Sequence, residues 1–290
     1  MNKVSFSQFT TWLGCPHSWK LQYVDGHRTY EDTIHTVFGT VIHEVIQMWL
    51  DILYNQSETV AKTIYLNDLF RERFIELFKQ ATIVNENGEK IFLADKKTLM
   101  EFYDQGCKII EYIQGNYKKF FPTNNVKLHS IEFPLEVSLG NDITYVGYVD
   151  VITYNELTKK YVLYDLKTSG RGWNDEQKKD PKKYVQLLLY KKFFSEQLGV
   201  PLDDISVEFI ILKRTIFEGS PYPIPRVSKF APSHGKPSIN KGWDLFSEFL
   251  DNCFDDGGNY ISEQSAKPSK NNCRWCPFRD NKDLCQYGVK

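Results

Sequence analysis

The stretch that decides the fold reads ITYVGYVDVITYNELTKKYVLYDLKT, at residues 143–168. It is rich in β-branched and aromatic residues, which predicts two strands at 143–154 and 161–168 with a polar turn at 155–160 between them. A connection this short joins antiparallel neighbours in a sheet. The centre of the chain is therefore predicted to be a β-hairpin.

Three charged residues of this hairpin are the candidate catalytic residues: Asp150 in the first strand, and Asp165 and Lys167 in the second. Because side chains alternate between the faces of a strand, Asp165 and Lys167 point the same way. Carboxylates hold Mg²⁺ or Mn²⁺ in phosphodiester hydrolysis, and a lysine orients or deprotonates the attacking water or neutralises developing charge. A solvated ion pair is the alternative, and the apolar run 161–164 before Asp165 argues against it.

The flanking sequence predicts helices before the hairpin and a mixed pattern after it. A strand at 126–139 and a turn at 140–142 lead into the hairpin. The order of helices, three-strand meander, helix and strand predicts an α/β fold built on a mixed sheet with flanking helices. The predicted helices span 5–23, 39–54, 61–80, 96–120, 176–198 and 241–254, a fourth strand spans 206–214, and 215–240 is expected to be irregular.

The composition of the 290 residues is that of an ordinary globular protein, with 41% hydrophobic and 25% charged residues. The formal net charge is −1, so a nucleic-acid binder of this kind needs a local groove and a bound cation. Aromatic residues make up 15%; most fill the core, and Trp12, Trp19 and Trp173 are candidates for stacking on bases. No apolar run approaches the roughly 20 residues that span a bilayer, and residues 1–6 lack a signal-peptide core, so an intracellular protein without membrane contact is expected.

Three of the six cysteines lie close together near the C-terminus, as Cys273-x-x-Cys276 followed by Cys285. In a reducing compartment this spacing indicates a metal site rather than disulfides. A two-residue gap lets both sulfur atoms bind one centre, in zinc and in iron–sulfur sites alike, and a fourth ligand is then needed. Cys107 and Cys253 lie in apolar helical segments and are expected to be buried thiols.

The motif Gly-x-x-Asp followed by Asp-x-Lys-Thr-Ser-Gly, at 147–150 and 165–170, resembles the catalytic core of RecB-like PD-(D/E)XK nucleases. The resemblance extends to the next helix, where Gln186 and Tyr190 match the family's Gln-x-x-x-Tyr motif. Four residues apart, the two side chains share a helix face. The resemblance implies a catalytic role for both, beside the three charged residues of the hairpin.

A metal site is also implied by the resemblance. Gly39-x-x-x-His43 looks like the family's Gly-x-x-x-His segment, whose histidine can bind the metal. The family places an acidic residue on the strand before Gly-x-x-Asp, where Glu132 fits and Glu136 is a competitor on the same face. The implied ligands of Mg²⁺ or Mn²⁺ are therefore His43, Glu132, Asp150 and Asp165.

Several RecB-like nucleases, including CRISPR-associated and AddB-type members, look similar in cysteine layout and bind a [4Fe–4S] cluster. By this resemblance the cluster ligands are Cys15, Cys273, Cys276 and Cys285, with Zn²⁺ on the same residues as the alternative. The metal centre would hold the N-terminal helix against the C-terminal tail. The implied architecture is one restriction-endonuclease-like nuclease domain over 1–290. It contains an N-terminal helix with the first cysteine, a helical insertion, the catalytic sheet core and a cysteine-rich tail, at 1–38, 55–125, 126–214 and 255–290.

The resemblance implies a Mg²⁺- or Mn²⁺-dependent DNA exonuclease that acts on single-stranded ends in recombination, repair or replication. Arg171, Lys182 and Lys183 are the candidate DNA contacts, with a solvated helix face as the alternative, and the loop 226–241 is a further candidate or a lid. A non-catalytic DNA-binding subunit is another reading, as is a module that works only within a helicase–nuclease or CRISPR-adaptation complex. No Walker A motif occurs, so a helicase motor would be a separate chain.

Overall fold

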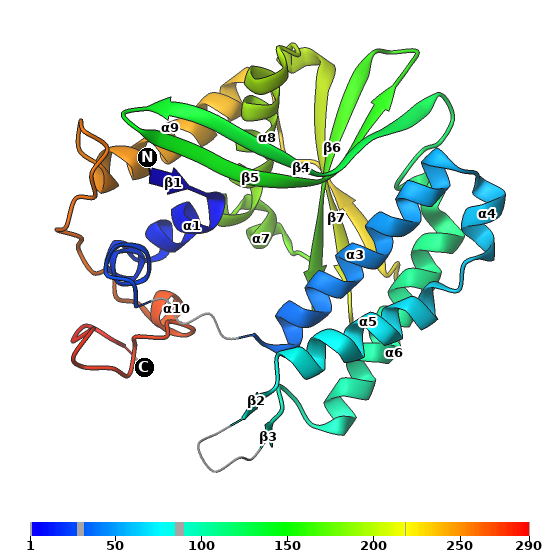
Figure 1. The fold of residues 1–290 in the computed structure, drawn as a ribbon, viewed down its shortest axis with the longest axis horizontal. Helices are drawn as coiled ribbons and strands as arrows, with labels where there is room; N and C mark the ends of the chain where they lie inside the picture. Colours follow the sequence, from blue (N-terminus) through cyan, green and yellow to red (C-terminus); the bar gives the residue numbers. More distant parts are fainter. Residues whose placement is uncertain (1, 28–31, 85–89, 218, 290) are drawn as a thin grey trace.

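The computed structural model describes residues 2–27, 32–84, 90–217 and 219–289 (Figure 1). Its centre is a mixed sheet of six strands in the order β1-β5-β6-β7-β8, with β4 paired to β5 outside this path. β1 runs parallel to β5 and β6 parallel to β7, whereas the other neighbours are antiparallel. The predicted mixed sheet is thereby confirmed. Its strands are β1 Asn2–Val4, β4 Val126–Gly140, β5 Ile143–Asn155, β6 Lys160–Ser169, β7 Ile205–Lys213 and β8 Val227–Phe230, and β2 Ile83–Val84 and β3 Lys90–Ile91 form a separate hairpin.

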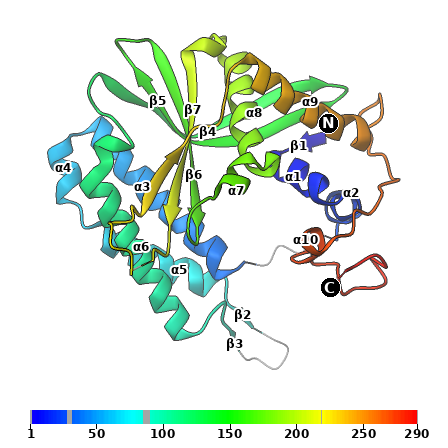
Figure 2. The same cartoon turned by 180° about the vertical axis from the view of Figure 1, so that it is seen from behind.

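Helices cover both faces of the sheet (Figure 1 and Figure 2). One face packs against α3, on which α5 and α6 lie, around a core that includes Phe38 and Leu166. The other face packs against α8, with α1 and α9 beside it, around Phe193 and Phe246. The α-helices are α1 Phe6–Gly14, α2 Pro16–Trp19, α3 Ile34–Asn55, α4 Glu58–Thr63, α5 Leu66–Gln80, α6 Lys96–Asn116, α7 Asp175–Lys179, α8 Pro181–Leu198, α9 Lys236–Cys253 and α10 Lys270–Cys273. Short turns of other helix types lie at Lys20–Val24, Tyr117–Lys119 and Leu202–Asp204.

Prolines divide two of the predicted helices. The helix predicted over 5–23 stops at Gly14, because Pro16 begins a new helix and Cys15 between them is extended. The helix predicted over 176–198 is likewise two helices, α7 and α8, since Asp180 is extended and caps α8 just before its first residue, Pro181. Cys15 and the lysines of α7 and α8 therefore lie at bends of the chain rather than on continuous helix faces.

Short elements and helix starts account for the other differences from the sequence pattern. The pattern predicts neither β1, β8 nor the β2–β3 hairpin, and β8 lies inside the stretch 215–240 that is expected to be irregular. β1 and β8 are short edge strands that add to the long strands β5 and β7. α3 begins at Ile34 because Thr33 forms a capping box, α9 begins at Lys236, and the helix predicted over 61–80 is the pair α4 and α5.

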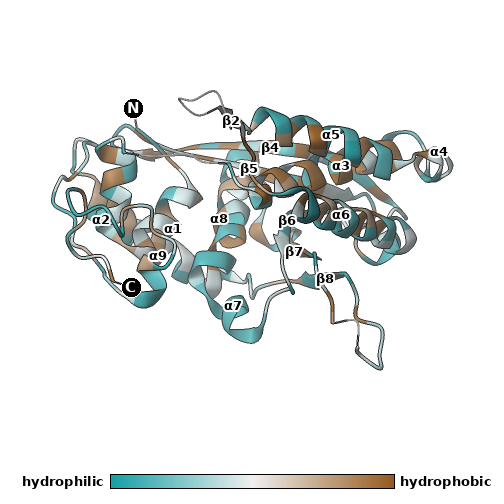
Figure 3. Cartoon of the chain, turned by 90° about the horizontal axis from the view of Figure 1, so that it is seen from below, coloured by the Kyte–Doolittle hydropathy of each residue, from teal (hydrophilic) through white to brown (hydrophobic). Residues whose placement is uncertain are grey.

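Helix α3 is the central helix of one core. By length and composition alone it could cross a membrane, which corrects the expectation that no apolar segment reaches that length. In the fold its apolar residues are buried between the sheet and the outer helices, with Trp49 at 1% exposure. Figure 3 shows hydrophobic residues along α3, whereas α7 is hydrophilic along its length.

Candidate active site

The candidate active site is a fork between β5 and β6. The two strands pair only from Asn155↔Lys160 to Val151↔Tyr164, after which β5 stays with β4 and β6 stays with β7. At the point of separation, Asp150 Oδ2 accepts a hydrogen bond of 2.6 Å from the Leu166 backbone N–H. A carboxylate thus takes the place of a strand partner, which brings an acidic group into the middle of the sheet.

Asp165 and Lys167 lie on the same face of β6, as the strand alternation predicts. Lys167 Nζ is 2.7 Å from Asp165 Oδ1. The Asp165 side chain is 1% exposed, whereas that of Lys167 is 34% exposed. The pair is therefore no solvated surface ion pair, because its acid is enclosed.

Burial dominates the electrostatics of the fork. It raises the pKa of Asp150 from 3.8 to about 6 and that of Asp165 from 3.8 to about 6. Burial disfavours the charged form of Lys167, but the carboxylates of Asp165 and Asp150 outweigh it and raise the pKa of Lys167. Two buried carboxylates beside one ammonium group leave negative charge uncompensated. A hard divalent cation bound by both carboxylates fits this donor set. It would compensate the negative charge and so remove the energetic cost of burying it.

His43 lies on α3, and its side chain reaches the fork. Its Nδ1 lies 3.6 Å from Asp150 Oδ2. Burial, together with the charge of Lys167, lowers the pKa of His43 to about 4, so the imidazole is neutral at pH 7 and can act as a metal ligand. One turn earlier, a Cβ at Gly39 would lie 3.5 Å from Thr168 Oγ1, which shows how closely α3 packs on β6.

Glu132 lies opposite Asp150 on β4, between the pairs Ile131↔Val151 and Phe133↔Val149. Its backbone has a φ of +47°, a conformation that non-glycine residues adopt at a cost. The competing residue Glu136 is exposed and pairs with Lys3 at 3.7 Å, away from the fork. The structure therefore brings Glu132 to the fork and not Glu136.

Gln47 is the residue of this site that sequence reasoning missed. It is 5% exposed, and its Nε2 donates hydrogen bonds to Glu132 Oε1 and, at 3.1 Å, to the Asp150 backbone oxygen. The available signal was its position, four residues after His43 on an otherwise apolar helix face. A buried amide needs partners, and here they are the acidic residue of β4 and the backbone of β5.

Gln186 and Tyr190 face each other on α8, as their spacing predicts. Gln186 Nε2 donates to Tyr190 Oη at 2.8 Å. Burial, reinforced by Asp165, raises the pKa of Tyr190, so its hydroxyl stays neutral and available to donate. A Cβ at Gly147 would lie 3.2 Å from the rings of both Tyr145 and Tyr190. The glycine of the Gly-x-x-Asp motif thus makes room for two tyrosine rings.

The predicted ligand set is only partly assembled. Within the described ranges, no three His, Cys, Asp or Glu side chains are arranged to hold one metal ion. His43 and Asp150 are in contact, Asp165 interacts electrostatically with both, and Glu132 lies across the strand pair from Asp150. The shared metal site of these four residues stays a prediction.

The three basic residues predicted to contact DNA do not form one surface. Arg171 is exposed in the loop after β6. Lys183 Nζ lies 4.8 Å from the centre of the Trp173 ring, and burial and the charge of Lys167 lower its pKa against the opposite effect of Asp180. Lys182 instead turns to α1, where its Nζ would be 3.2 Å from a Cβ at Gly14. Lys183 therefore faces the fork, and Lys182 faces the N-terminal helices.

Two of the three tryptophans considered for base stacking are core residues. Trp19 is 0% exposed and Trp12 8%, and both pack against Phe249. They cannot receive a base, because the core already encloses their rings. Trp173 is half-buried beside Phe209 and Phe230, and it stays a candidate.

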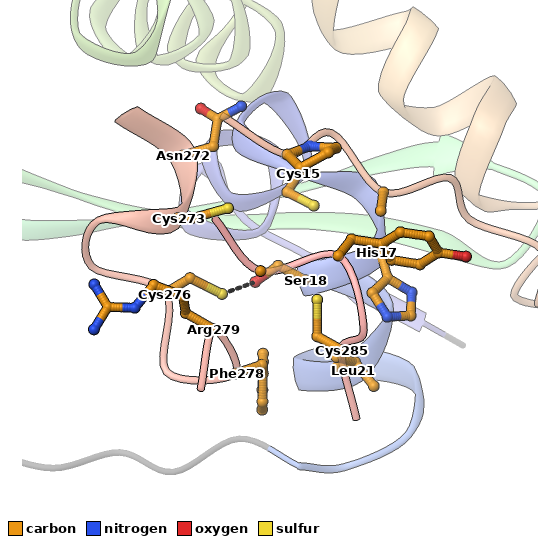
Figure 4. A pocket seen from close by; sticks show the side chains of 14 residues that line it. Cys15, His17, Ser18, Leu21, Asn272, Cys273, Cys276, Phe278, Arg279 and Cys285 are labelled. Atoms are coloured by element: carbon orange, nitrogen blue, oxygen red, sulfur yellow. Dashed lines mark hydrogen bonds between the residues drawn. The ribbon is translucent and has the colours of Figure 1, made fainter. Parts of the chain in front are cut away.

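The four cysteines predicted as cluster ligands line one small cavity between the N-terminal helices and the C-terminal tail (Figure 4). Figure 4 shows their sulfur atoms turned toward one another. Cys15 comes from the bend between α1 and α2, and Cys273, Cys276 and Cys285 come from the tail. All four are free thiols. The fold thus brings together cysteines from its two ends, but in the described residues no three of them are spaced to hold one metal ion, and the shared centre stays a prediction.

Polar groups surround these sulfur atoms. The Lys267 backbone N–H donates to Cys15 Sγ at 3.3 Å, and Ser18 Oγ lies 3.8 Å from Cys276 Sγ. His17 Nε2 contacts the Leu284 carbonyl oxygen at 3.1 Å, which ties α2 to the tail. Outside the cavity, Cys253 is buried as predicted, whereas Cys107 is only half-buried.

Comparisons with known proteins agree with this architecture. The sequence matches the PD-(D/E)XK nuclease superfamily over residues 3–285. No curated protein matches the chain. Among solved structures, the crystal structure of a "Putative exonuclease" from Eubacterium rectale is similar in fold, with a TM-score of 0.51 and 10% sequence identity, covering 95% of this chain and 86% of that chain. The superfamily match includes both strands of the fork and extends across both cores, and the chain belongs to the PD-(D/E)XK nuclease superfamily.

Proposed function

We propose that the protein is a Mg²⁺- or Mn²⁺-dependent DNA exonuclease that hydrolyses phosphodiester bonds at single-stranded ends in recombination, repair or replication. The observation that carries the proposal is the buried Asp165 and the partly buried Asp150 beside Lys167, in a chain of this nuclease superfamily. Buried acids of this kind are costly for stability and typical of catalytic sites. The similar solved structure is that of a protein called an exonuclease, which supports exonuclease activity.

In the proposed mechanism, Asp150 and Asp165 would hold the metal, with His43 and Glu132 as further ligands. A bound Mg²⁺ or Mn²⁺ would supply water activation and neutralisation of phosphate charge. Lys167 keeps its proton at neutral pH because its pKa is raised, so it orients water and stabilises the transition-state charge rather than acting as a base. Tyr190, held by Gln186, supplies a neutral hydroxyl donor on the α8 side of the fork.

The same proposal assigns the remaining segments of the chain. Residues 1–290 act as one nuclease domain, with 126–214 as the catalytic core and 55–125 as a helical insertion on α3. Arg171, Lys182 and Lys183 contact DNA phosphates at separate places along the strand. The four cysteines of the cavity bind a [4Fe–4S] cluster, with Zn²⁺ as the chemical alternative, and this centre fastens the 255–290 tail to the N-terminal segment at 1–38. The convergence of four thiols on one cavity supports it.

The test is degradation of 5′- and 3′-labelled single-stranded DNA by anaerobically purified protein, with Mg²⁺ or Mn²⁺. Lys167→Ala is expected to reduce the rate about 10²–10³-fold, because one charged transition-state contact is lost. Lys160→Ala is the matched control, since this exposed lysine begins the same strand at its other end. Intact wild-type protein that binds DNA and carries iron but cleaves nothing would favour a partner-dependent or non-catalytic subunit instead.

A further inference from the structure

A groove of about 600 Å³ lies on the α8 side of the sheet, at the edge strand β8. Its walls come from α7, the start of α8, β8 and the start of α9. The lining includes three lysines, two aromatic rings and one carboxylate: Lys178, Lys179, Lys241, Tyr184, Phe230 and Asp175. We call it the α7–α9 groove. Its positive charge contrasts with the net charge of −1 of the whole chain.

The lysines of the α7–α9 groove are poorly compensated. Asp175 lies 3.4 Å from Lys178 Nζ. In the ranges that the structure describes, neither Lys179 nor Lys241 has a carboxylate at ion-pair distance, and both are exposed. Lys213, which pairs with Ser169 at the end of β6, is close enough to Lys178 to be affected by its charge. Such uncompensated positive charge is what a polyanion binds.

A continuous path of rings and lysines joins the groove to the fork. Lys183 is close enough to Lys167 to be affected by its charge, and its Nζ lies 4.8 Å from the centre of the Trp173 ring. The Trp173 and Phe230 rings have centroids 6.1 Å apart, and Lys178 Nζ lies 6.0 Å from the centre of the Phe230 ring. A chain whose reacting phosphate is at the fork can therefore continue along this path into the groove.

The walls of the groove are held in place before any ligand binds. Phe230 is stacked on the core residue Phe209, with ring planes 8° apart. The loop between β8 and α9 is fixed by Lys191, a 4% exposed lysine whose Nζ donates to the His234 carbonyl oxygen at 3.0 Å. α7, which forms another wall, is hydrophilic along its length (Figure 3). A preformed groove loses little conformational entropy on binding.

We propose that the α7–α9 groove binds a segment of single-stranded DNA, with phosphates on Lys179 and Lys241 and a base against Tyr184. The groove volume is that of a small-ligand site of roughly 300–1,000 Å³, which suits a few nucleotides of one strand and not a duplex. Half-buried rings beside lysines, such as Tyr184 and Phe230 here, can offer a face on which an unpaired base stacks. The inference rests on the proposed function, since it assigns the path by which the substrate enters or leaves that site.

The test measures binding of a fluorescent single-stranded oligonucleotide in chelator, where no cleavage occurs. The double variant Lys179→Glu with Lys241→Glu is expected to bind roughly tenfold or more weakly, and the slope of log affinity against log salt should fall by about 1.4, or 0.7 per lost phosphate contact. The matched control is Lys79→Glu with Lys108→Glu, which reverses two exposed charges on α5 and α6. Equal binding by the groove variant and wild type overturns the inference.

Tyr184 tests the stacking contact separately. Tyr184→Leu is expected to weaken single-strand binding roughly fivefold or more, whereas Tyr184→Phe keeps the ring and the affinity. If a blunt duplex loses as much affinity as a single strand in these variants, the single-strand assignment is wrong.

Hydrolysis of a small phosphodiester, bis(p-nitrophenyl) phosphate, separates the two proposals. Groove variants should hydrolyse it as wild type does, because it reaches the fork without the groove. A wild type that hydrolyses neither this compound nor DNA contradicts the proposed function. The binding comparison in chelator still decides whether the groove binds single-stranded DNA.

Discussion

At the scale of single residues, Gln47 joins three elements of the fork through one amide group. From α3 it donates to Glu132 on β4 and to the backbone of Asp150 on β5. Gln47→Leu removes both donors at similar volume. We expect a roughly 10–100-fold higher Mn²⁺ requirement or lower activity, because residues that orient metal ligands have effects of this size. The half-saturating Mn²⁺ concentration and the maximal rate measure it.

Gln105→Leu is the matched control for this prediction. Gln105 is buried to a similar degree, at 7% exposure, and accepts a hydrogen bond from Arg214 Nη1 at 3.2 Å. Both variants lose buried hydrogen bonds and should be destabilised by about 1–3 kcal/mol. If the Mn²⁺ requirement changes equally in the two, Gln47 is a structural residue and does not position Glu132.

The acids of the fork make a second prediction, on the pH dependence of metal binding. Asp150 and Asp165 have pKa values raised to about 6 by burial, and metal binds their deprotonated forms. Affinity for Mn²⁺ should therefore rise with pH up to about 6, roughly tenfold per pH unit for each carboxylate, and level off above pH 7. His43 adds nothing in this range, because its pKa of about 4 leaves it already neutral.

Calorimetry of the metal-free protein in buffers of different ionisation enthalpy measures this proton release. The expected result is release of up to two protons per bound site at pH 5, falling toward zero above pH 7. Affinity that does not change between pH 5 and pH 7 would contradict the assignment of these two carboxylates as ligands.

At the scale of elements, two glycines of α6 differ in what surrounds them. A Cβ at Gly106 would lie 2.3 Å from the Phe70 ring of α5, whereas nothing lies within 4 Å of a Cβ at Gly115. Gly106→Ala should destabilise the protein by about 1–3 kcal/mol through overpacking. Gly115→Ala should stabilise it by up to about 1 kcal/mol through helix propensity. Denaturant unfolding compares them, and destabilisation by both variants would count against the tight α5–α6 contact.

Elements also differ in how well their sequence predicts them. Long segments such as α6, β4 and β6 are predicted close to their observed ranges, since each carries its pattern over many residues. The edge strands β1 and β8 are not, because three or four residues carry no period and depend on a partner strand. The apolar spacing by itself predicts one continuous helix at each of two places. The bends before Pro16 and Pro181 divide each of them.

At the scale of the whole molecule, the cysteine cavity connects the two ends of the chain. Cys15→Ser or Cys285→Ser is expected to lose the bound iron and its visible absorption, and to release the tail. Trypsin should then cut the tail at lysines and arginines such as Lys267 and Arg279 faster than in wild type. Iron and zinc analysis identifies the metal.

Cys107→Ala is the control for this prediction, because Cys107 lies on α6 outside the cavity. It should keep the metal and the protease resistance of wild type. Protein that contains neither iron nor zinc after anaerobic purification would contradict the proposed metal centre. A tail in Cys15→Ser that is as resistant to trypsin as in wild type would also contradict it.

The sequence by itself determined local geometry, namely the shared face of Asp165 and Lys167 and the contact of Gln186 with Tyr190. These follow from strand and helix periods, which act within a few residues. Only the tertiary structure decided where β5 leaves β6, and so how Asp150 becomes a buried acid. It also brought Gln47 to Glu132, buried Trp19, and set the α7–α9 groove at the edge strand β8, because packing between distant segments depends on no local period.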